Sequence, residues 1–353
     1  MRIQEANLVN LVTRIFVHSG TPANIAEQVA RHLVTANLKG HDSHGVGMIP
    51  TYLYGIQAGN LNPNAHAKIV KDQGSVMLVD GGTGFGQVVG REATELAIER
   101  VKENGLVCMG VRNCHHLGRI GAYGELCGAA GLISIHFVNV VGHDPQVSPF
   151  AGRERRMTTN PFCCVVPREG QEPIVLDMAT STIALGKVRV ANMKGEKVPA
   201  GALLDHEGLP TQDPGVMYSE PMGSLAPFGA HKGYGLAVMC ELLGGALVGE
   251  WTAQPKNPRK NTIINNMLMF VLDPTAFGTE KFADEVREMT DYLHNTTPSK
   301  GHDRVRVPGD PERETRTTRR RDGIDIDANS WGEIVSAAVA IGMEERDIVA
   351  LAN

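Results

Sequence analysis

Several patterns that define protein classes are missing from this 353-residue sequence. The six cysteines form no C-x-x-C pair, which argues against zinc ribbons and dithiol redox motifs and favours reduced thiols in a cytoplasmic protein. No apolar run approaches membrane-spanning length, and the first residues lack a basic-then-apolar leader, so we expect no membrane partner. The net charge of −5 gives no reason to expect a nucleic-acid partner.

A dinucleotide-binding fingerprint is also missing. Residues 75–80 predict a strand, and glycines follow it at positions 81, 82, 84 and 86. The G-x-G-x-x-G spacing fails, because it would need a glycine where Gln87 or Val89 stands. The acidic residue expected about twenty positions later is absent as well. We therefore exclude an ordinary Rossmann domain at this point of the chain.

The sequence instead predicts a mixed α/β protein. Its length allows about two domains, and 42% hydrophobic with 21% charged residues is typical of globular chains. Residues 250–261 predict a surface loop and 295–311 a linker. We expect helices over residues 1–60, 87–102, up to 130, 233–247, 280–294, 312–322 and 330–352, and strands over 75–80, 106–111, 132–138, 161–167, 174–179 and 263–273.

The stretch around His44 is the first candidate site. A helix ends at Gly40, and Asp42 and Ser43 then occupy the capping position of a second helix, with His44 in its first turn. The dipole of that helix would disfavour a charged imidazole, so we expect His44 to be neutral near pH 7 and able to take and give a proton. The local pattern also allows a structural interpretation, in which Asp42 and Ser43 only cap the helix.

A loop after the predicted strand 106–111 carries the second candidate, the pair His115 and His116. Open α/β sheets commonly bind ligands at the carboxyl ends of their strands. Adjacent side chains on an extended chain point in opposite directions, so we expect at most one of the two to enter a site. The alternative is a metal-dependent hydrolase that uses His41, His44, His115 and His116, although these residues lack an established ligand spacing with a supporting carboxylate.

Two further segments could hold a phosphate or a ribose. Leu176–Ser181 is a strand that runs into small and hydroxyl residues, whose amides could bind an anion or only form a turn. Pro227–Gly235 is a glycine-rich turn that carries Lys232 into the start of a long helix, without the spacing of a nucleotide triphosphate loop. The basic run Arg319–Arg321 predicts a solvated or interface face.

Six motifs in this order resemble the type-2 lactate/malate dehydrogenase family, which is unrelated to the Rossmann dehydrogenases. The resemblance covers nearly the whole chain. It implies a helical domain from residues 1–72 and 280–353, an α/β cofactor-binding domain from residues 73–279, and a homodimer whose active site lies near the interface. The motifs are Asp42-Ser43-His44-Gly45, Asn113-x-x-His116-x-Gly118, Thr159-Asn160-Pro161, Leu176–Ser181, Gly229-x-His231-Lys232-Gly233-Tyr234-Gly235, and Pro308-Gly309 followed by Glu312.

The resemblance also implies an activity, the transfer of a hydride between NAD or NADP and a 2-hydroxy or 2-oxo carboxylic acid. Proton exchange would fall to His44 and His116, with Ser43 and Asp42 orienting His44, and no metal is expected. A nicotinamide-binding protein without catalysis is a further interpretation. The cofactor is expected on Asn160, Leu176, Asp177, Met178, Ala179, Thr180, Ser181, His231, Lys232, Gly309, Asp310 and Pro311.

The chain departs from the family pattern at the substrate. Many relatives carry an arginine where Met48 stands, and a guanidinium is a natural clamp for a carboxylate. Arg119 is expected to replace that clamp, and an ion pair at a helix start is the alternative. Tyr52 would also grip the substrate. An apolar wall at Met48 suggests acceptance of malate- or lactate-type acids and of bulkier 2-oxo acids such as phenylpyruvate or 2-oxoglutarate. Relatives often have a serine where Val140 stands, so we expect the cofactor contact made by that serine to be lost here.

Overall fold

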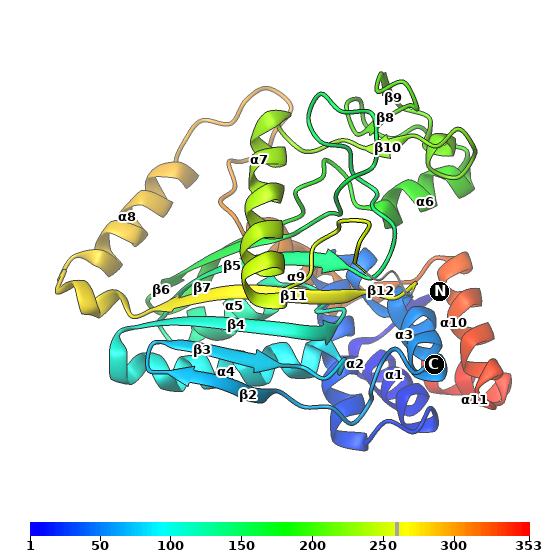
Figure 1. Ribbon diagram of the computed structural model, residues 1–353, viewed down its shortest axis with the longest axis horizontal. Coiled ribbons are helices and arrows are strands. Elements are labelled where there is room, and N and C mark those ends of the chain that lie inside the picture. The colour runs from blue at the N-terminus through cyan, green and yellow to red at the C-terminus, as the bar shows by residue number, and fades with distance from the viewer. Residues whose placement is uncertain (258–260) are drawn as a thin grey trace.

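The computed structural model describes residues 1–257 and 261–353; residues 258–260, inside the predicted loop 250–261, lie outside it. A seven-stranded sheet forms the centre of the molecule (Figure 1). Its strands are, in chain order, β2 (Lys68–Gln73), β3 (Val76–Asp80), β4 (Leu106–His115), β5 (Ile133–Val141), β6 (Phe162–Arg168), β7 (Gln171–Met178) and β11 (Ile264–Leu272).

The order across this sheet is β2-β3-β4-β11-β5-β6-β7. Strands β3 and β4 run parallel, and the other neighbouring pairs are antiparallel. A Rossmann sheet is mostly parallel, so the observed topology confirms the predicted mixed α/β fold of non-Rossmann type.

Two helices, α4 (Gly86–Asn104) and α5 (Gly121–Ala129), cover one face of the sheet. Apolar residues recur along α4 at helical spacing and pack on the inward residues of β3, β4 and β11. The helix ends as predicted at Gly105, whose φ of +71° is readily adopted by glycine. Helix α7 (His231–Cys240), which continues into the π-helical segment η4 (Glu241–Gly249), lies on the other face (Figure 1).

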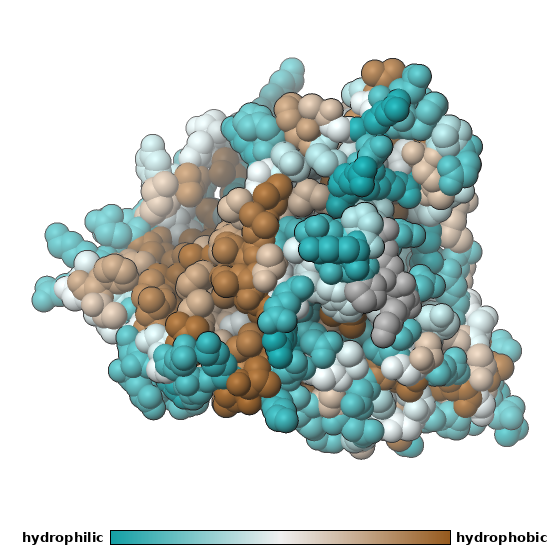
Figure 2. Space-filling model, viewed as in Figure 1, coloured by the Kyte–Doolittle hydropathy of each residue, from teal (hydrophilic) through white to brown (hydrophobic). Residues whose placement is uncertain are grey.

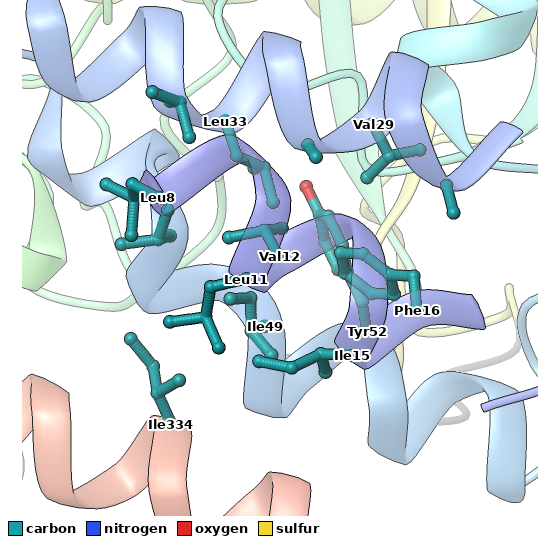
Figure 3. Packing of buried hydrophobic residues seen from close by; sticks show 14 of the residues in the cluster. Leu8, Leu11, Val12, Ile15, Phe16, Val29, Leu33, Ile49, Tyr52 and Ile334 are labelled. Atoms are coloured by element: carbon teal, nitrogen blue, oxygen red, sulfur yellow. The ribbon is translucent and has the colours of Figure 1, made fainter. Parts of the chain in front are cut away.

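A helical layer built from both chain ends lies beside the sheet. It contains a core separate from that of the sheet, in which side chains of the N-terminal helices meet Ile334 (Figure 3). Each fully buried side chain of this size stabilises the fold by about 2 kcal/mol. Strand β1 (Arg2–Ile3) pairs with β12 (Ile324–Asp325), which ties the two ends together. The helices of this layer are α1 (Glu5–His18), α2 (Ala23–Leu38), α3 (Ile49–Gln57), α9 (Asp310–Asp322), α10 (Ala328–Ala340) and α11 (Glu345–Ala352).

Some features of the fold were not expected from the sequence. Strand β2 was not predicted, and the expected domain boundary at residue 72 falls inside it. Helix α8 (Phe282–His294), expected in the helical domain, contacts β6 of the sheet. A small third core also forms around α6 (Leu185–Lys194) and the two-residue strands β8 (Leu203–Leu204), β9 (Pro210–Thr211) and β10 (Ser224–Leu225), which are too short to show a periodic pattern. Within the described ranges, no helix is long and apolar enough to cross a membrane.

Candidate active site

The turn that carries His44 differs from its predicted form. Asp42–His44 and Val46–Met48 are two short 3-10 turns, and α3 begins only at Ile49. Gly45 lies between the two turns in an extended conformation, with φ −92° and ψ −153°. The prediction that His44 lies in the first turn of a capped helix is therefore wrong, and no dipole of such a helix acts on its imidazole.

Side chains from α2 and α9 hold this turn in place. Asn37 donates from Nδ2 to Asp42 Oδ1 over 2.7 Å and accepts at Oδ1 from the Val46 main-chain N–H over 2.8 Å. Arg319 donates to both carboxylate oxygens of Asp42, over 2.5 and 2.9 Å. The carboxylate of Asp42 thus fixes the main chain of the turn. Asp42 therefore positions His44 through that main chain.

The fold brings His44 and His116 together. Their rings stack with centroids 5.4 Å apart and an interplanar angle of 27°. Ser43 Oγ lies 3.0 Å from Nδ1 of His44, and Tyr52 Oη lies 2.8 Å from Nδ1 of His116. Each imidazole is therefore held at one nitrogen by a neutral hydroxyl.

The main chain beside His116 is fixed on both edges. The Leu117 N–H donates to Oδ1 of Asn265 over 2.8 Å, and its carbonyl accepts from the Tyr123 hydroxyl over 2.5 Å. His115 is 2% exposed, whereas His116 is half-buried beside His44. The two adjacent histidines thus occupy different environments, and His116 is the one at the stacked pair.

Burial sets the charge of these groups. Burial, together with positive charge at His41 and Arg119, lowers the pKa of His44 to about 4. Burial and the neighbouring histidines lower the pKa of His116 well below its ordinary value. Burial also raises the pKa of Tyr52, so its hydroxyl keeps its proton. At pH 7 the pair is neutral and could exchange a proton with a bound group.

Two predicted substrate contacts, Tyr52 and Met48, have other partners in this structure. Tyr52 is fully buried. Its hydroxyl accepts from Nε2 of Gln87 over 2.7 Å. Met48 is half-buried and packs against the core of the helical layer. Tyr52 therefore supports His116, and Met48 gives the turn an apolar side.

Arg119 lies in a buried charge cluster at the start of α5. Its Nη2 is 2.6 Å from Oε2 of Glu125, which also accepts from Lys39 over 2.6 Å. Its Nη1 is 3.8 Å from Oδ2 of Asp177. The guanidinium is 2% exposed. This geometry favours the ion-pair alternative for Arg119 over a clamp on substrate.

Asn160, expected at the cofactor, is buried and has partners at both polar atoms. Its Oδ1 accepts from the hydroxyl of Thr158 over 2.6 Å and from the Val140 N–H over 3.2 Å. Its Nδ2 donates to Glu241 over 2.7 Å and to the Ala237 carbonyl over 3.3 Å. In this arrangement Asn160 joins the start of β6 to α7.

A cavity of about 640 Å³ adjoins two of the predicted cofactor segments: its lining includes Thr182, which follows Ser181, and Gly229 and Ala230, which precede His231. An isolated bridge pairs Ser181 with Pro227, which places the segment after β7 beside the turn before α7. His231 and Lys232 are exposed in the first turn of α7. Ala179 and Thr180 lie in the same segment as Ser181, immediately after β7.

The remaining predicted cofactor residues meet where α9 begins. The Val175 N–H donates to the Pro308 carbonyl over 3.2 Å, so the Gly309–Pro311 turn lies beside Leu176–Met178. Asp177 accepts from the Gly121 N–H over 2.7 Å, and burial raises its pKa while Arg119 opposes that rise. Asp310 is held by Arg313 and His294. The predicted residues therefore fall into two groups, one at each end of residues 176–182.

The metal alternative finds no support in this geometry. Among the described residues, no group of three or more His, Cys, Asp or Glu side chains is placed to hold a metal ion. His41 lies 3.3 Å from Glu312, and His115 is buried with its ring against Tyr52.

Sequence reasoning missed four supporting residues. Asn37, Asn265 and Arg319 lie far along the chain from the groups they hold. Gln87 was noted only as the residue that breaks the glycine fingerprint. Its place directly after Gly86, where the chain turns into α4, is a signal that could have marked it as part of the site.

Comparison with known proteins gives a consistent family. The family model described as malate/L-lactate dehydrogenase matches residues 3–335. Hydroxycarboxylate dehydrogenase B of Escherichia coli O157:H7 is 44% identical over 351 residues, which are 99% of this chain and 97% of that protein. L-lactate dehydrogenase of Cupriavidus necator is 41% identical over 97% of this chain and 99% of its own length.

Solved structures agree with this result. A putative malate/lactate dehydrogenase from E. coli superposes with a TM-score of 0.95 at 43% identity, covering 99% of this chain and 98% of that one. Sulfolactate dehydrogenase from Methanocaldococcus jannaschii superposes with a TM-score of 0.85 at 34% identity, covering 99% and 100%.

Proposed function

The chain belongs to the malate/L-lactate dehydrogenase family, and from this premise we propose that it is an NAD- or NADP-dependent dehydrogenase of 2-hydroxy and 2-oxo carboxylic acids. The observation that carries the proposal is the stacked pair of neutral imidazoles, His44 and His116, each held by a hydroxyl. Oxidation of the alcohol releases a proton from its oxygen, which a neutral imidazole positioned there can take, and in the reduction the imidazolium returns that proton to the oxygen.

The residues around the 640 Å³ cavity suit a nicotinamide dinucleotide. Lys232, exposed in the first turn of α7, would contact its phosphates, and Thr182 at the edge of the cavity would contact a ribose. The Gly309–Pro311 turn would contact the part bound along β7. When bound, the nicotinamide supplies or takes the hydride.

The chain's own residues would bind and polarise the substrate. A neutral His116 donates a hydrogen bond to the substrate oxygen, while His44 exchanges a proton with it. Ser43 and Tyr52 hold the two rings. Met48, half-buried in the turn that carries His44, offers an apolar side chain where many relatives have an arginine, which supports acceptance of bulkier apolar 2-oxo acids such as phenylpyruvate.

The test is the loss of near-ultraviolet absorbance of NADH or NADPH with purified protein and a panel of 2-oxo acids. We expect turnover of several acids, with phenylpyruvate at least as good as pyruvate or oxaloacetate. Strict preference for pyruvate or oxaloacetate would contradict the proposal that Met48 permits bulkier acids. Binding of cofactor without turnover of any acid would indicate a nicotinamide-binding protein that does not catalyse.

We also propose a homodimer that associates through the face of the sheet that carries α7 and η4, with the active site near the interface. Figure 2 shows apolar side chains gathered along α7 and the sheet beside it. Met239 of α7 and Leu242 and Leu247 of η4 are exposed apolar residues of these elements. Exposed apolar patches of this kind commonly mark interfaces. Light scattering should give about twice the chain mass of 38.0 kDa, and a double change of Leu242 and Leu247 to Glu should give monomers.

The free cysteines support a reducing, cytoplasmic location.

A further inference from the structure

A buried chain of three side chains leads away from His116. Nε2 of Gln87 lies 2.7 Å from Oη of Tyr52, and that Oη lies 2.8 Å from Nδ1 of His116. Gln87 is 2% exposed and Tyr52 is fully buried. Water therefore has little access to these bonds, and the three groups must satisfy one another.

The direction of each bond in this chain is fixed by what the groups can donate. The amide nitrogen of Gln87 has protons and no acceptor capacity, so it donates to Tyr52. The hydroxyl has a single proton, and with Gln87 already donating to its oxygen, that proton points to Nδ1 of His116. A neutral imidazole has one N–H, which must then be on Nε2.

We infer that Gln87 is a positioning residue that fixes His116 as the Nε2–H tautomer through the hydroxyl of Tyr52. The tautomer itself does not depend on the proposed function, and only its consequence for catalysis rests on that function. An Nε2–H imidazole donates a hydrogen bond to the substrate oxygen and has no free lone pair to act as a base. Proton exchange with that oxygen then falls to His44, whose Nδ1 pairs with Ser43 Oγ at 3.0 Å.

Helix α4 places Gln87 where it can act in this way. Its main-chain carbonyl accepts from Nε2 of Gln28 over 3.3 Å, which ties this first turn of α4 to α2. Oε1 of Gln87 has no hydrogen-bond partner among the described residues. The opposite orientation of the amide would turn Oε1 towards Tyr52, reverse both bonds and place the proton of His116 on Nδ1. The tautomer of His116 therefore reports the orientation of Gln87.

The test is nitrogen NMR of the protein labelled with ¹⁵N-histidine, with the His116 signals assigned by their loss in His116→Gln. We expect a protonated Nε2 and a bare Nδ1 in the unaltered protein. In Gln87→Glu the carboxylate accepts from Tyr52, so the proton of His116 should move to Nδ1. Gln73→Glu is the matched control, because it makes the same change at an exposed position of β2 outside this hydrogen-bonded chain, and it should leave the tautomer as it is.

The kinetic consequence is measured on the same proteins. A histidine held in the wrong tautomer can lower kcat by about 10⁴-fold in serine proteases, and we expect Gln87→Glu to lose at least about 10²-fold in kcat with little change in KM. A protonated Nδ1 in the unaltered protein, or an unchanged tautomer in Gln87→Glu, would overturn the inference. The expected tautomer in a protein that turns over no 2-oxo acid would support the inference and count against the proposed function alone.

If Gln87→Glu unfolds, Gln87→Met provides the second variant. It removes the donor without adding charge, so Tyr52 loses its fixed direction and His116 should show both tautomers. A pure Nε2–H signal in Gln87→Met would show that Gln87 does not set the tautomer.

Discussion

Arg319 and Asp42, 277 residues apart in the sequence, form a two-pronged ion pair with distances of 2.5 and 2.9 Å. The pair joins α9 to the turn that carries His44. The other arginines of this basic run are paired as well, Arg320 with Glu5 and Arg321 with Asp322. The sequence predicted a solvated or interface face for the run, and Arg319 has the more particular role of holding the turn.

Removal of the Arg319 side chain should displace His44 and lower kcat, with only a small loss in the free energy of unfolding. We expect Arg319→Ala to lower kcat about tenfold, since a displacement of about 1 Å can cost about 10²-fold. The free energy of unfolding should fall by only about 1 kcal/mol, because Asp42 is half-exposed and water screens the pair. Steady-state kinetics and urea unfolding measure the two effects.

The control for this prediction is Arg321→Ala, a neighbouring change away from the turn. The double change Asp42→Arg with Arg319→Asp reverses the pair and should recover part of the lost kcat, which is the signature of a direct interaction. Equal losses from Arg319→Ala and Arg321→Ala would contradict the role given to Arg319.

Stability should fall on acidification, because burial lowers the pKa of several histidines. The pKa falls to about 4 for His115 and to about 3 for His136, with burial as the cause. Between about pH 6.5 and pH 4 the unfolded chain binds protons at these sites that the folded chain does not. The unfolding free energy should therefore fall by about 1 kcal/mol per pH unit for each such histidine.

Thermal or urea unfolding from pH 7 to pH 5 measures this slope. Replacement of His136 by Asn should flatten it, whereas replacement of the exposed His206 should not. A slope that is the same in all three proteins would show that His136 does not contribute.

We expect Arg119 to stabilise the folded protein and to have little effect on KM for the substrate. Its loss in Arg119→Met would leave Asp177 buried without its nearby positive charge, while Glu125 would keep Lys39. Breaking a buried ion pair from one side typically costs about 3 kcal/mol, and KM for 2-oxo acids should change by less than about threefold, which is below 1 kcal/mol.

The clamp interpretation makes the opposite prediction for the same variant. A KM raised tenfold or more with an unchanged free energy of unfolding would show that Arg119 binds the substrate carboxylate. Both quantities should be measured on one preparation, so that a partly unfolded sample is not mistaken for a weakened substrate contact.

The sequence predicted the parts of the molecule that depend on local pattern. The strand at residues 106–111 and the helix ending at Gly105 show clear periodicity and a glycine stop, and both are present. Helix α6 and the edge strand β2 were missed because their apolar spacing is weak, and β2 is exposed along its whole length.

The site was harder to predict than the elements around it. His44 and His116 could be identified by type and motif, but their stacking depends on contacts between distant segments. The helix predicted at His44 fails because extended Gly45 separates the two turns. An ion pair of Arg119 at a helix start could be stated as an alternative, but its partner Glu125 was not predicted, and its contact with Asp177 requires the packing of α5 on β7.

The roles proposed for His44 and His116 in the reduction of 2-oxo acids are tested by removing each side chain. The rate of NADH or NADPH oxidation with the best acid of the panel is compared in the unaltered protein, His44→Ala and His116→Ala, with His206→Ala as the control. We expect a loss of about 10²- to 10⁴-fold in kcat for each of the two site variants and none for the control. Full activity in either site variant, with the fold intact by circular dichroism, would contradict these roles.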